Sequence, residues 1–216
     1  MKEAFRKLPD EKRLFILNTA AEIFARDGYH EAAIADICKN SGISNGALYK
    51  YFNNKEDLFL SIIDYGIGLI RGLFHQFETT TPVLDTLNKI FTVIKNMATQ
   101  QGFIISIYLD LGTCALNRFA EQKSDILERI GKDFLSELLS NAASRGEIDR
   151  SPDIRSAVYL IDNLIILYSY STVSEHYRKR LLVFMDEKSD VSEKKKIAFM
   201  LGTIKDILGM NKNTLR

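Results

Sequence analysis

The residues Gly42-Ile43-Ser44-Asn45-Gly46 have the spacing of a nucleophile elbow, in which the central serine attacks an ester or amide carbon. That chemistry requires a sharp turn from a β-strand into a helix at the top of a parallel sheet. Helical spacing precedes Gly42, and no series of parallel strands is recognisable in the chain. No pattern marks His30, His75 or His176 as a general base. We therefore expect no catalytic residue and no enzymatic activity.

The two cysteines offer little other chemistry. Cys38 and Cys114 have no partners at the spacing of metal ligands, and the chain contains no H-E-x-x-H sequence. We expect both to be small buried hydrophobic residues, and we expect no metal and no cofactor. A redox-sensing role for Cys114 stays open as a minor alternative.

A window without acidic residues suggests binding to an anionic surface. From Ile37 to Lys55 there are three lysines (Lys39, Lys50 and Lys55) and no Asp or Glu. At 100° per residue, Leu48 and Phe52 share one face of a short helix, and Gly46, Tyr49 and Lys50 lie opposite them. Such a face suits a groove lined by phosphates. A helical corner whose surface happens to be basic is the other interpretation, and these residues alone leave both open.

The elements that must position these residues are helices throughout. Each of the three prolines stands where a helix can begin, and apolar residues recur at helical spacing. We predict an all-α chain of about nine helices. Their expected ranges are 10–27, 33–41, 45–51, 55–77, 82–100, 103–111, 117–145, 152–177 and 193–208, with 178–191 in part a loop.

Residues 33–52 have the pattern of a helix-turn-helix. Two short helices flank Gly42, which tolerates the positive φ that a tight turn requires. Ile43 can then pack back on Ile37 and Cys38.

The C-terminal part contains a helix that is apolar on all sides. Residues 157–170 hold eleven apolar or aromatic residues in fourteen, interrupted by Asp162 and Asn163. A helix of this kind must be buried on more than one side. One face can pack on its own domain and the other can meet a partner chain; an unusually enclosed core helix of a monomer is the alternative. Ile197, Leu201, Ile204 and Leu208 form one stripe on the last helix, so we expect these two helices to form a dimer interface.

Composition limits the remaining possibilities. The 216 residues are 46% hydrophobic and 26% charged, with a formal net charge of +1, so nucleic-acid binding would depend on a local patch. No apolar run approaches the ~18 residues of a membrane helix, and the N-terminus has no apolar leader segment. We expect a cytoplasmic protein without a membrane partner.

Four stretches together resemble the DNA-binding domain of TetR/AcrR-type transcriptional regulators. They are Phe24–Tyr29, Ile34–Ile37, Gly42–Phe52 and Lys55–Leu58, and they agree with the family in order and spacing over about residues 10–60. The resemblance implies an all-helical homodimer with a three-helix, helix-turn-helix domain at residues 1–54. It also implies a helical domain at 55–216 that binds a small effector and dimerises. Such a regulator, most often a repressor, binds a palindromic operator and releases it when the effector binds.

The chain departs from the family pattern in two respects. Ala32 and Ala33 stand where threonine often caps the second helix and contacts phosphate, and the loss of such a cap costs about 1 kcal/mol. Asn45 stands where Lys or Arg is common, and its amide can pair with adenine instead. We therefore expect base preferences that differ from those of relatives with a basic residue there.

The resemblance also assigns roles to individual residues. Asn45, Gly46 and Ala47 would approach base edges, and Lys50 would contact a base or a phosphate. The remaining predicted DNA contacts are Ser44, Tyr49, Tyr51 and Lys55, and for Tyr51 core packing is an equal alternative. The predicted effector site, for a hydrophobic or amphipathic ligand, comprises Phe103, Ile107, Tyr108, Phe119, Tyr159 and Asn163. The alternative function is a helical ligand-binding protein or enzyme without a DNA-binding role.

Overall fold

The computed structural model describes residues 1–148 and 153–210. These residues form ten α-helices and one short 3₁₀ helix and contain no β-strand, which confirms the predicted all-α class. The elements are α1 (Glu3–Arg6), α2 (Asp10–Glu31), α3 (Ile34–Ser41), α4 (Asn45–Tyr51), α5 (Lys55–His75), α6 (Val83–Leu111), η1 (Cys114–Leu116), α7 (Asn117–Ser144), α8 (Ile154–Val173), α9 (Glu175–Phe184) and α10 (Glu193–Ile207).

The two helices predicted at 82–100 and 103–111 form one element, α6, which is kinked between them. Hydrogen bonding continues through this element, but Gln101 has φ −140° and ψ 34°, so the two predicted helices meet at a kink. A similar interruption occurs in α2, where Gly28 has φ 77° and ψ 159° before the helix continues to Glu31. The expectation that Gly28 departs from helical geometry is therefore confirmed, whereas α2 ends at Glu31, four residues after the expected end at Asp27.

The predicted helix 152–177 is wrong at its C-terminal end. α8 ends at Val173, Ser174 is extended with φ −117° and ψ 122°, and α9 occupies part of the expected loop. The hydroxyls of Ser169, Ser171 and Thr172 donate back to carbonyls three or four residues earlier, a local bonding pattern that weakens helices. The predicted start at Ser151 and Pro152 lies outside the described residues. Asp153 caps α8 by accepting a hydrogen bond from the Arg155 amide at 3.2 Å.

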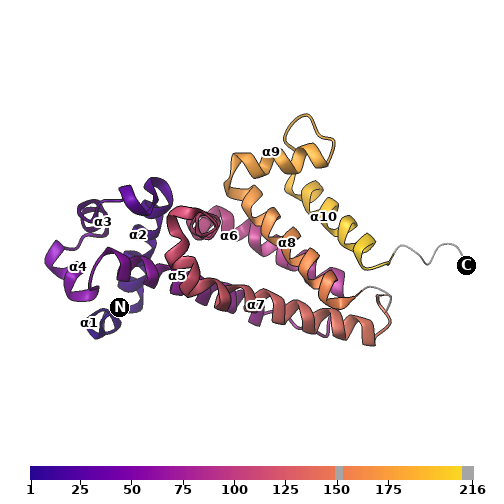
Figure 1. Ribbon diagram of the computed structural model, residues 1–216, viewed down its shortest axis with the longest axis horizontal. Helices are drawn as coiled ribbons and strands as arrows, with labels where there is room; N and C mark the ends of the chain where they lie inside the picture. Colours follow the sequence, from indigo (N-terminus) through magenta and orange to yellow (C-terminus); the bar gives the residue numbers. More distant parts are fainter. Residues whose placement is uncertain (149–152, 211–216) are drawn as a thin grey trace, which may run out of the picture. The chain divides into compact units, whose positions relative to one another are not determined.

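The described chain divides into two compact units. The first contains residues 1–70 and 103–124, and the second contains residues 71–102 and 125–210. In Figure 1 the first four helices are drawn in indigo and violet beside the N-terminus. The predicted functional boundary after residue 54 stays a prediction.

Among the described residues, α5 is long and apolar enough to cross a membrane by length and composition, although it contains no unbroken apolar run of that length. An 18-residue window within its 21 residues has a mean hydropathy of 1.3, whereas α6 and the helices that follow it pass the same test only as a pair bent by 94°. Helices of a protein core pass the same test. Leu58, Phe59 and Ile62 of α5 are buried, so its apolar composition serves packing.

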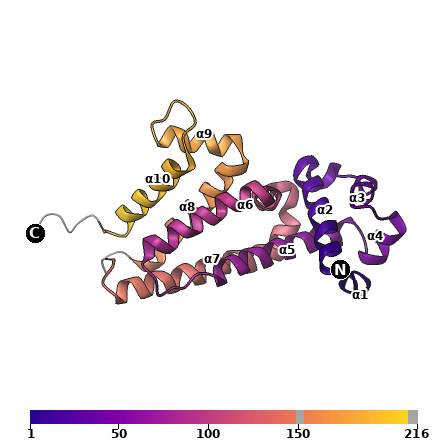
Figure 2. The ribbon, with the colours of Figure 1, turned by 180° about the vertical axis from the view of Figure 1, so that it is seen from behind.

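The core of the second unit is formed by α6, α7, α8 and α10. α10 runs beside α8 in both views (Figures 1 and 2). The predicted dimer stripe of α10 is largely part of this core: Ile197, Ile204 and Leu208 are buried, and Leu201 packs partly against the same cluster. The stripe as predicted is therefore wrong, because these side chains face their own domain.

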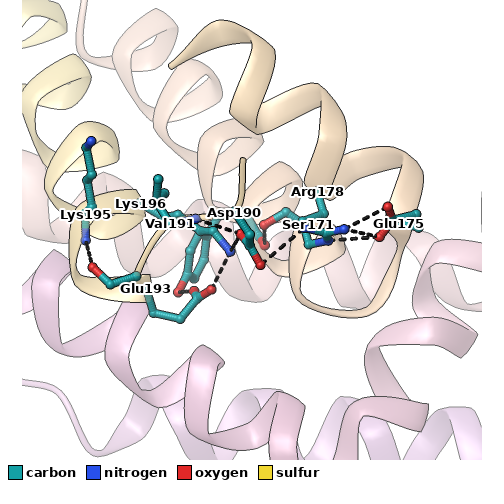
Figure 3. Close-up of polar contacts among 10 residues, drawn as sticks. Ser171, Glu175, Arg178, Asp190, Val191, Glu193, Lys195 and Lys196 are labelled. Atoms are coloured by element: carbon teal, nitrogen blue, oxygen red, sulfur yellow. Dashed lines mark hydrogen bonds and ion pairs between the residues drawn. The ribbon is translucent and has the colours of Figure 1, made fainter. Parts of the chain in front are cut away.

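An ion-pair network around one buried lysine joins α10 to α9 and the segment between them. The Lys196 ammonium is almost wholly buried and lies 3.0 Å from Asp190 and 2.7 Å from Glu193 (Figure 3). Arg178 of α9 binds the same Asp190 at 3.2 Å, and Glu193 accepts a hydrogen bond from Tyr168 of α8 at 2.9 Å. The network satisfies a charge that would be costly to bury alone and fixes α9 to its neighbours.

A half-buried carboxylate lies where α7 and α8 meet. A β-carbon on Gly131 of α7 would come within 2.7 Å of an Asp162 carboxylate oxygen, so this carboxylate packs directly on the α7 backbone. Burial, with a smaller contribution from the negative charge of Glu128, raises the pKa of Asp162 from its usual 3.8 to about 6. The ionised form of Asp162 therefore opposes folding at neutral pH.

This shift predicts a pH-dependent effect of Asp162→Asn. Because the folded pKa exceeds the unfolded one, the folded state is favoured most below pH 4 and loses that advantage as pH rises from 4 to 6. Asparagine avoids the penalty, so we expect the variant to gain about 1–3 kcal/mol in unfolding free energy at pH 7.5 and almost nothing at pH 4. Urea titrations at both pH values measure the difference. An equal effect at both values would contradict this assignment, and Asp85→Asn, an exposed site, is the control.

Candidate nucleic-acid interface

The turn between α3 and α4 has the predicted geometry. Gly42 lies in the left-handed region with φ 65° and ψ 30°, where a side chain is strained. The Ile43 amide donates to the Cys38 carbonyl at 3.1 Å, which closes the end of α3. Ser44 caps α4 by accepting from the Ala47 amide at 3.1 Å. One role of Ser44 is thus to start the helix, and its hydroxyl hydrogen is not used by this bond.

The two faces of α4 are divided as predicted. Leu48 and Phe52 are fully buried, whereas Asn45, Gly46 and Lys50 are exposed and Tyr49 is 49% exposed. Ala47 is half-buried at the margin. The side chains expected to meet DNA therefore share an open surface, while contact with DNA stays a prediction.

Helix α1 supports α4 and was not predicted. Phe5 is fully buried and its ring centroid lies 4.7 Å from Phe52 and 5.6 Å from Tyr51. Lys2 donates from its ammonium to the Tyr49 carbonyl at 2.8 Å and from its amide to the Tyr51 carbonyl at 2.8 Å. These bonds satisfy the last carbonyls of α4. Tyr51 is half-buried in this contact, so packing is one of its roles.

Lys55 is less free than the prediction assumed. Its ammonium donates to the His30 carbonyl at 2.9 Å and lies 5.1 Å from the centroid of the Tyr29 ring. Burial lowers the pKa of Lys55. Lys55 thus connects α2 to α5, and its ammonium has two further donors for the phosphate contact, which stays a prediction.

An aromatic cluster that was not predicted from the sequence connects α2, α5 and α7 within the first unit. Tyr29, Phe59 and Phe119 lie with ring centroids 4.8–4.9 Å apart. Arg118 donates to the Tyr29 hydroxyl at 2.9 Å and pairs with Glu56 at 3.4 Å. Phe119 is fully buried here and packs against Tyr29 and Phe59, and its role as an effector contact stays a prediction. The adjacent pair Arg118-Phe119 contained no signal for this cluster, because the contact joins residues about 90 positions apart.

The other predicted effector residues are divided between the two units. Ile107 is buried and Phe103 and Tyr108 are half-buried in the first unit. In the second unit Tyr159 is 68% exposed, and the Asn163 amide donates to the Tyr159 carbonyl at 2.7 Å. Both line a groove of about 510 Å³ between α7 and α8. Binding of an effector by any of these five stays a prediction.

The cysteines differ in exposure. Cys38 is buried, and burial raises the pKa of its thiol, whereas Cys114 is exposed, contrary to the expectation that both are buried. In the part of the chain that the structure describes, no group of three or more His, Cys, Asp or Glu side chains is arranged to hold a metal ion.

Comparison with known proteins shows that the N-terminal helices match a family of bacterial regulators. Residues 16–62 match the family model "Bacterial regulatory proteins, tetR family". The chain is 27% identical over 154 residues to the fatty acid metabolism regulator protein of Bacillus subtilis, covering 69% of this chain and 77% of the relative. It is 44% identical over 161 residues to the HTH-type transcriptional regulator YuxN of the same organism, covering 73% of this chain and 54% of that relative.

One solved structure has the same fold as this chain over most of the length of both proteins. The transcriptional regulator FadR from Bacillus subtilis, in complex with stearoyl-CoA, superposes with a TM-score of 0.64 at 19% identity, covering 91% of this chain and 98% of that one. At this identity the likeness concerns the fold alone.

Proposed function

Because the chain belongs to the TetR family of bacterial transcriptional regulators, we propose that it is a homodimeric repressor released from its operator by a small effector. DNA binding and transcriptional regulation are what its relatives do, and none of those compared above is an enzyme. A bacterial regulator of this kind works in the cytoplasm, beside the chromosome.

The observation that carries this proposal is the exposed, acid-free face of α4. Asn45, Gly46 and Lys50 are exposed beside a tight turn, and Leu48 behind them is fixed in the core. A short helix held this way can enter a major groove with its N-terminal residues on base edges. Two copies related by a two-fold axis would bind two halves of a palindromic operator.

Side-chain exposure supports a dimer face on α8 and α10 that differs from the predicted stripe. Leu160 is 48% exposed, and Leu164 and Leu167 are half-exposed on the same side of α8. On α10 the outer side carries Ala198 and Gly202, whose small size allows a second helix to approach closely. A partner covering these residues would remove exposed apolar surface from water.

We propose an effector with a long hydrocarbon chain. The notion of a hydrophobic or amphipathic ligand agrees with the relative whose name concerns fatty acid metabolism and with the solved regulator that contains stearoyl-CoA. The effector must bind more tightly to a conformation whose recognition helices no longer fit successive grooves. The proposed contacts remain Phe103, Ile107, Tyr108, Phe119, Tyr159 and Asn163.

Recovery of bound fragments from genomic DNA of the source organism tests the proposal. We expect the purified protein to retain promoter fragments and to lower transcription from them in a reconstituted assay. Addition of stearoyl-CoA or palmitoyl-CoA should restore transcription, and coenzyme A alone should not. Retention of no specific fragment would favour the alternative of a helical ligand-binding protein without a DNA-binding role.

A further inference from the structure

The short helix α1 lies beside α4, the helix proposed to contact DNA, and precedes the residues that match the family. The match covers residues 16–62, whereas α1 comprises Glu3–Arg6. α1 and α4 are neighbours within the first unit in both views (Figures 1 and 2). The role of α1 must therefore be derived from its own contacts.

α1 is fixed to the rest of the first unit at two points. Phe5 is fully buried, and its ring centroid lies 4.7 Å from that of Phe52. The guanidinium of Arg13, in α2, donates to the carbonyls of Arg6 and Leu8 at 2.9 Å each. α1 is therefore a firm support for the contacts that its N-terminal end makes.

α4 needs such a support because it is short. A helix of seven residues is marginal on its own, and the carbonyls of its last turn have no amide partners within the helix. Lys2 donates to two of these carbonyls, from its amide to Tyr51 and from its ammonium to Tyr49, at 2.8 Å each. The ammonium also offsets the partial negative charge at the C-terminal end of the helix. Lys2 thus closes the end of α4 opposite to the Ser44 cap.

The last turn of α4 carries two of the side chains assigned to DNA. Tyr49 is 49% exposed and Lys50 is exposed, so the direction of each depends on a backbone that stays helical. The ends of helices are among the parts of a protein that open locally at low cost. An opened turn lowers the fraction of molecules that are ready to bind, and the apparent affinity falls in proportion to that fraction.

We propose that Lys2 is a positioning residue for DNA binding, which holds the last turn of α4 in the conformation that enters the groove. This inference rests on the proposed contact of α4 with the operator. Lys2 acts through the carbonyls of Tyr49 and Tyr51 rather than on DNA itself, because its ammonium is bonded to the first of them. At a palindromic operator the effect counts twice, once for each half-site.

Replacing Lys2 by methionine removes the ammonium and keeps both the length of the side chain and the backbone amide. We expect operator affinity to fall about 4- to 25-fold, from a loss of about 2- to 5-fold at each half-site. The slope of log affinity against log salt should stay unchanged, because no phosphate contact is lost. Lys2→Arg, which can donate to the same carbonyl, should restore most of the affinity. Fluorescence anisotropy with the operator selected by the wild type measures these changes.

Lys7→Met is the matched control. It removes the same charge just after α1, where the exposed Lys7 ammonium pairs with Glu3 at 2.8 Å. We expect its operator affinity to lie within about 2-fold of the wild type. Equal losses in the two variants, or a salt slope that is shallower by about 2 units in Lys2→Met, would assign the effect to charge near DNA and overturn the positioning role. An unchanged affinity of Lys2→Met would overturn it as well.

Amide hydrogen exchange tests the same role without DNA. In Lys2→Met the amides of Tyr51 and Phe52, at the end of α4, should exchange about 3- to 10-fold faster, whereas amides in the middle of α5 should keep their rates. Loss of affinity without this faster exchange would refute the inference, since Lys2 would then not act through α4. A wild type that binds no operator would instead refute the proposed function, and the exchange rates would still decide whether Lys2 holds α4.

Discussion

Replacing Lys50 by glutamate should lower affinity for the operator by about 100- to 1,000-fold at 0.15 M salt. Lys50 is exposed on the outer face of α4, within a window that contains no acidic residue. Reversal of its charge removes a phosphate or base contact and adds repulsion at both half-sites, about 1.5–2 kcal/mol each. The slope of log affinity against log salt should also become shallower by about 2 units.

Fluorescence anisotropy with the recovered operator measures this change. Lys89→Glu is the matched control, because it produces the same change in net charge at an exposed position of α6. We expect that control to bind within about 3-fold of the wild type, since distant exposed charges are screened. If both variants lose affinity equally, the effect belongs to net charge, and α4 does not form the interface.

Leu160→Glu should separate the dimer into folded monomers. Leu160 is 48% exposed in the single chain, so glutamate is tolerated there until a partner covers it. Burial of an unpaired charge in each subunit costs about 3–5 kcal/mol per site, which raises the dissociation constant by at least about 1,000-fold. Operator binding should fall with dimerisation, because two half-sites are no longer engaged together.

Sedimentation at micromolar concentration distinguishes the two states. Ile126→Glu is a matched control, because Ile126 is 47% exposed on α7, outside the proposed interface. We expect the control to remain dimeric and both variants to keep wild-type helical content. A Leu160→Glu protein that stays dimeric would show that α8 does not form the interface.

The helix-turn-helix was predictable because its signals are local. Gly42 must adopt positive φ, Ser44 is a favoured N-cap, and the spacing of Leu48 and Phe52 selects the buried face. Each of these features depends on residues within a few positions of one another. Once Leu48 and Phe52 define the buried face of α4, the residues on the opposite side must be exposed.

Other features depend on contacts between distant residues and escaped prediction. Phe119 packs against Tyr29, and the Lys55 ammonium donates a hydrogen bond to the His30 carbonyl at the end of α2. On α10 the periodicity identified an apolar stripe, but periodicity does not state whether that stripe meets its own domain or a partner. Burial of Ile204 and Leu208 within one chain decided that question.

Selection of bound sequences from random duplex DNA tests the central claim most directly. With wild-type protein, the account predicts enrichment of an inverted repeat whose half-sites lie about one helical turn apart, or a multiple of it. With Asn45→Ala, the preference at one base pair in each half-site should relax by about 1–3 kcal/mol while the other positions keep theirs. A wild-type selection that enriches no sequence over random DNA would contradict the account.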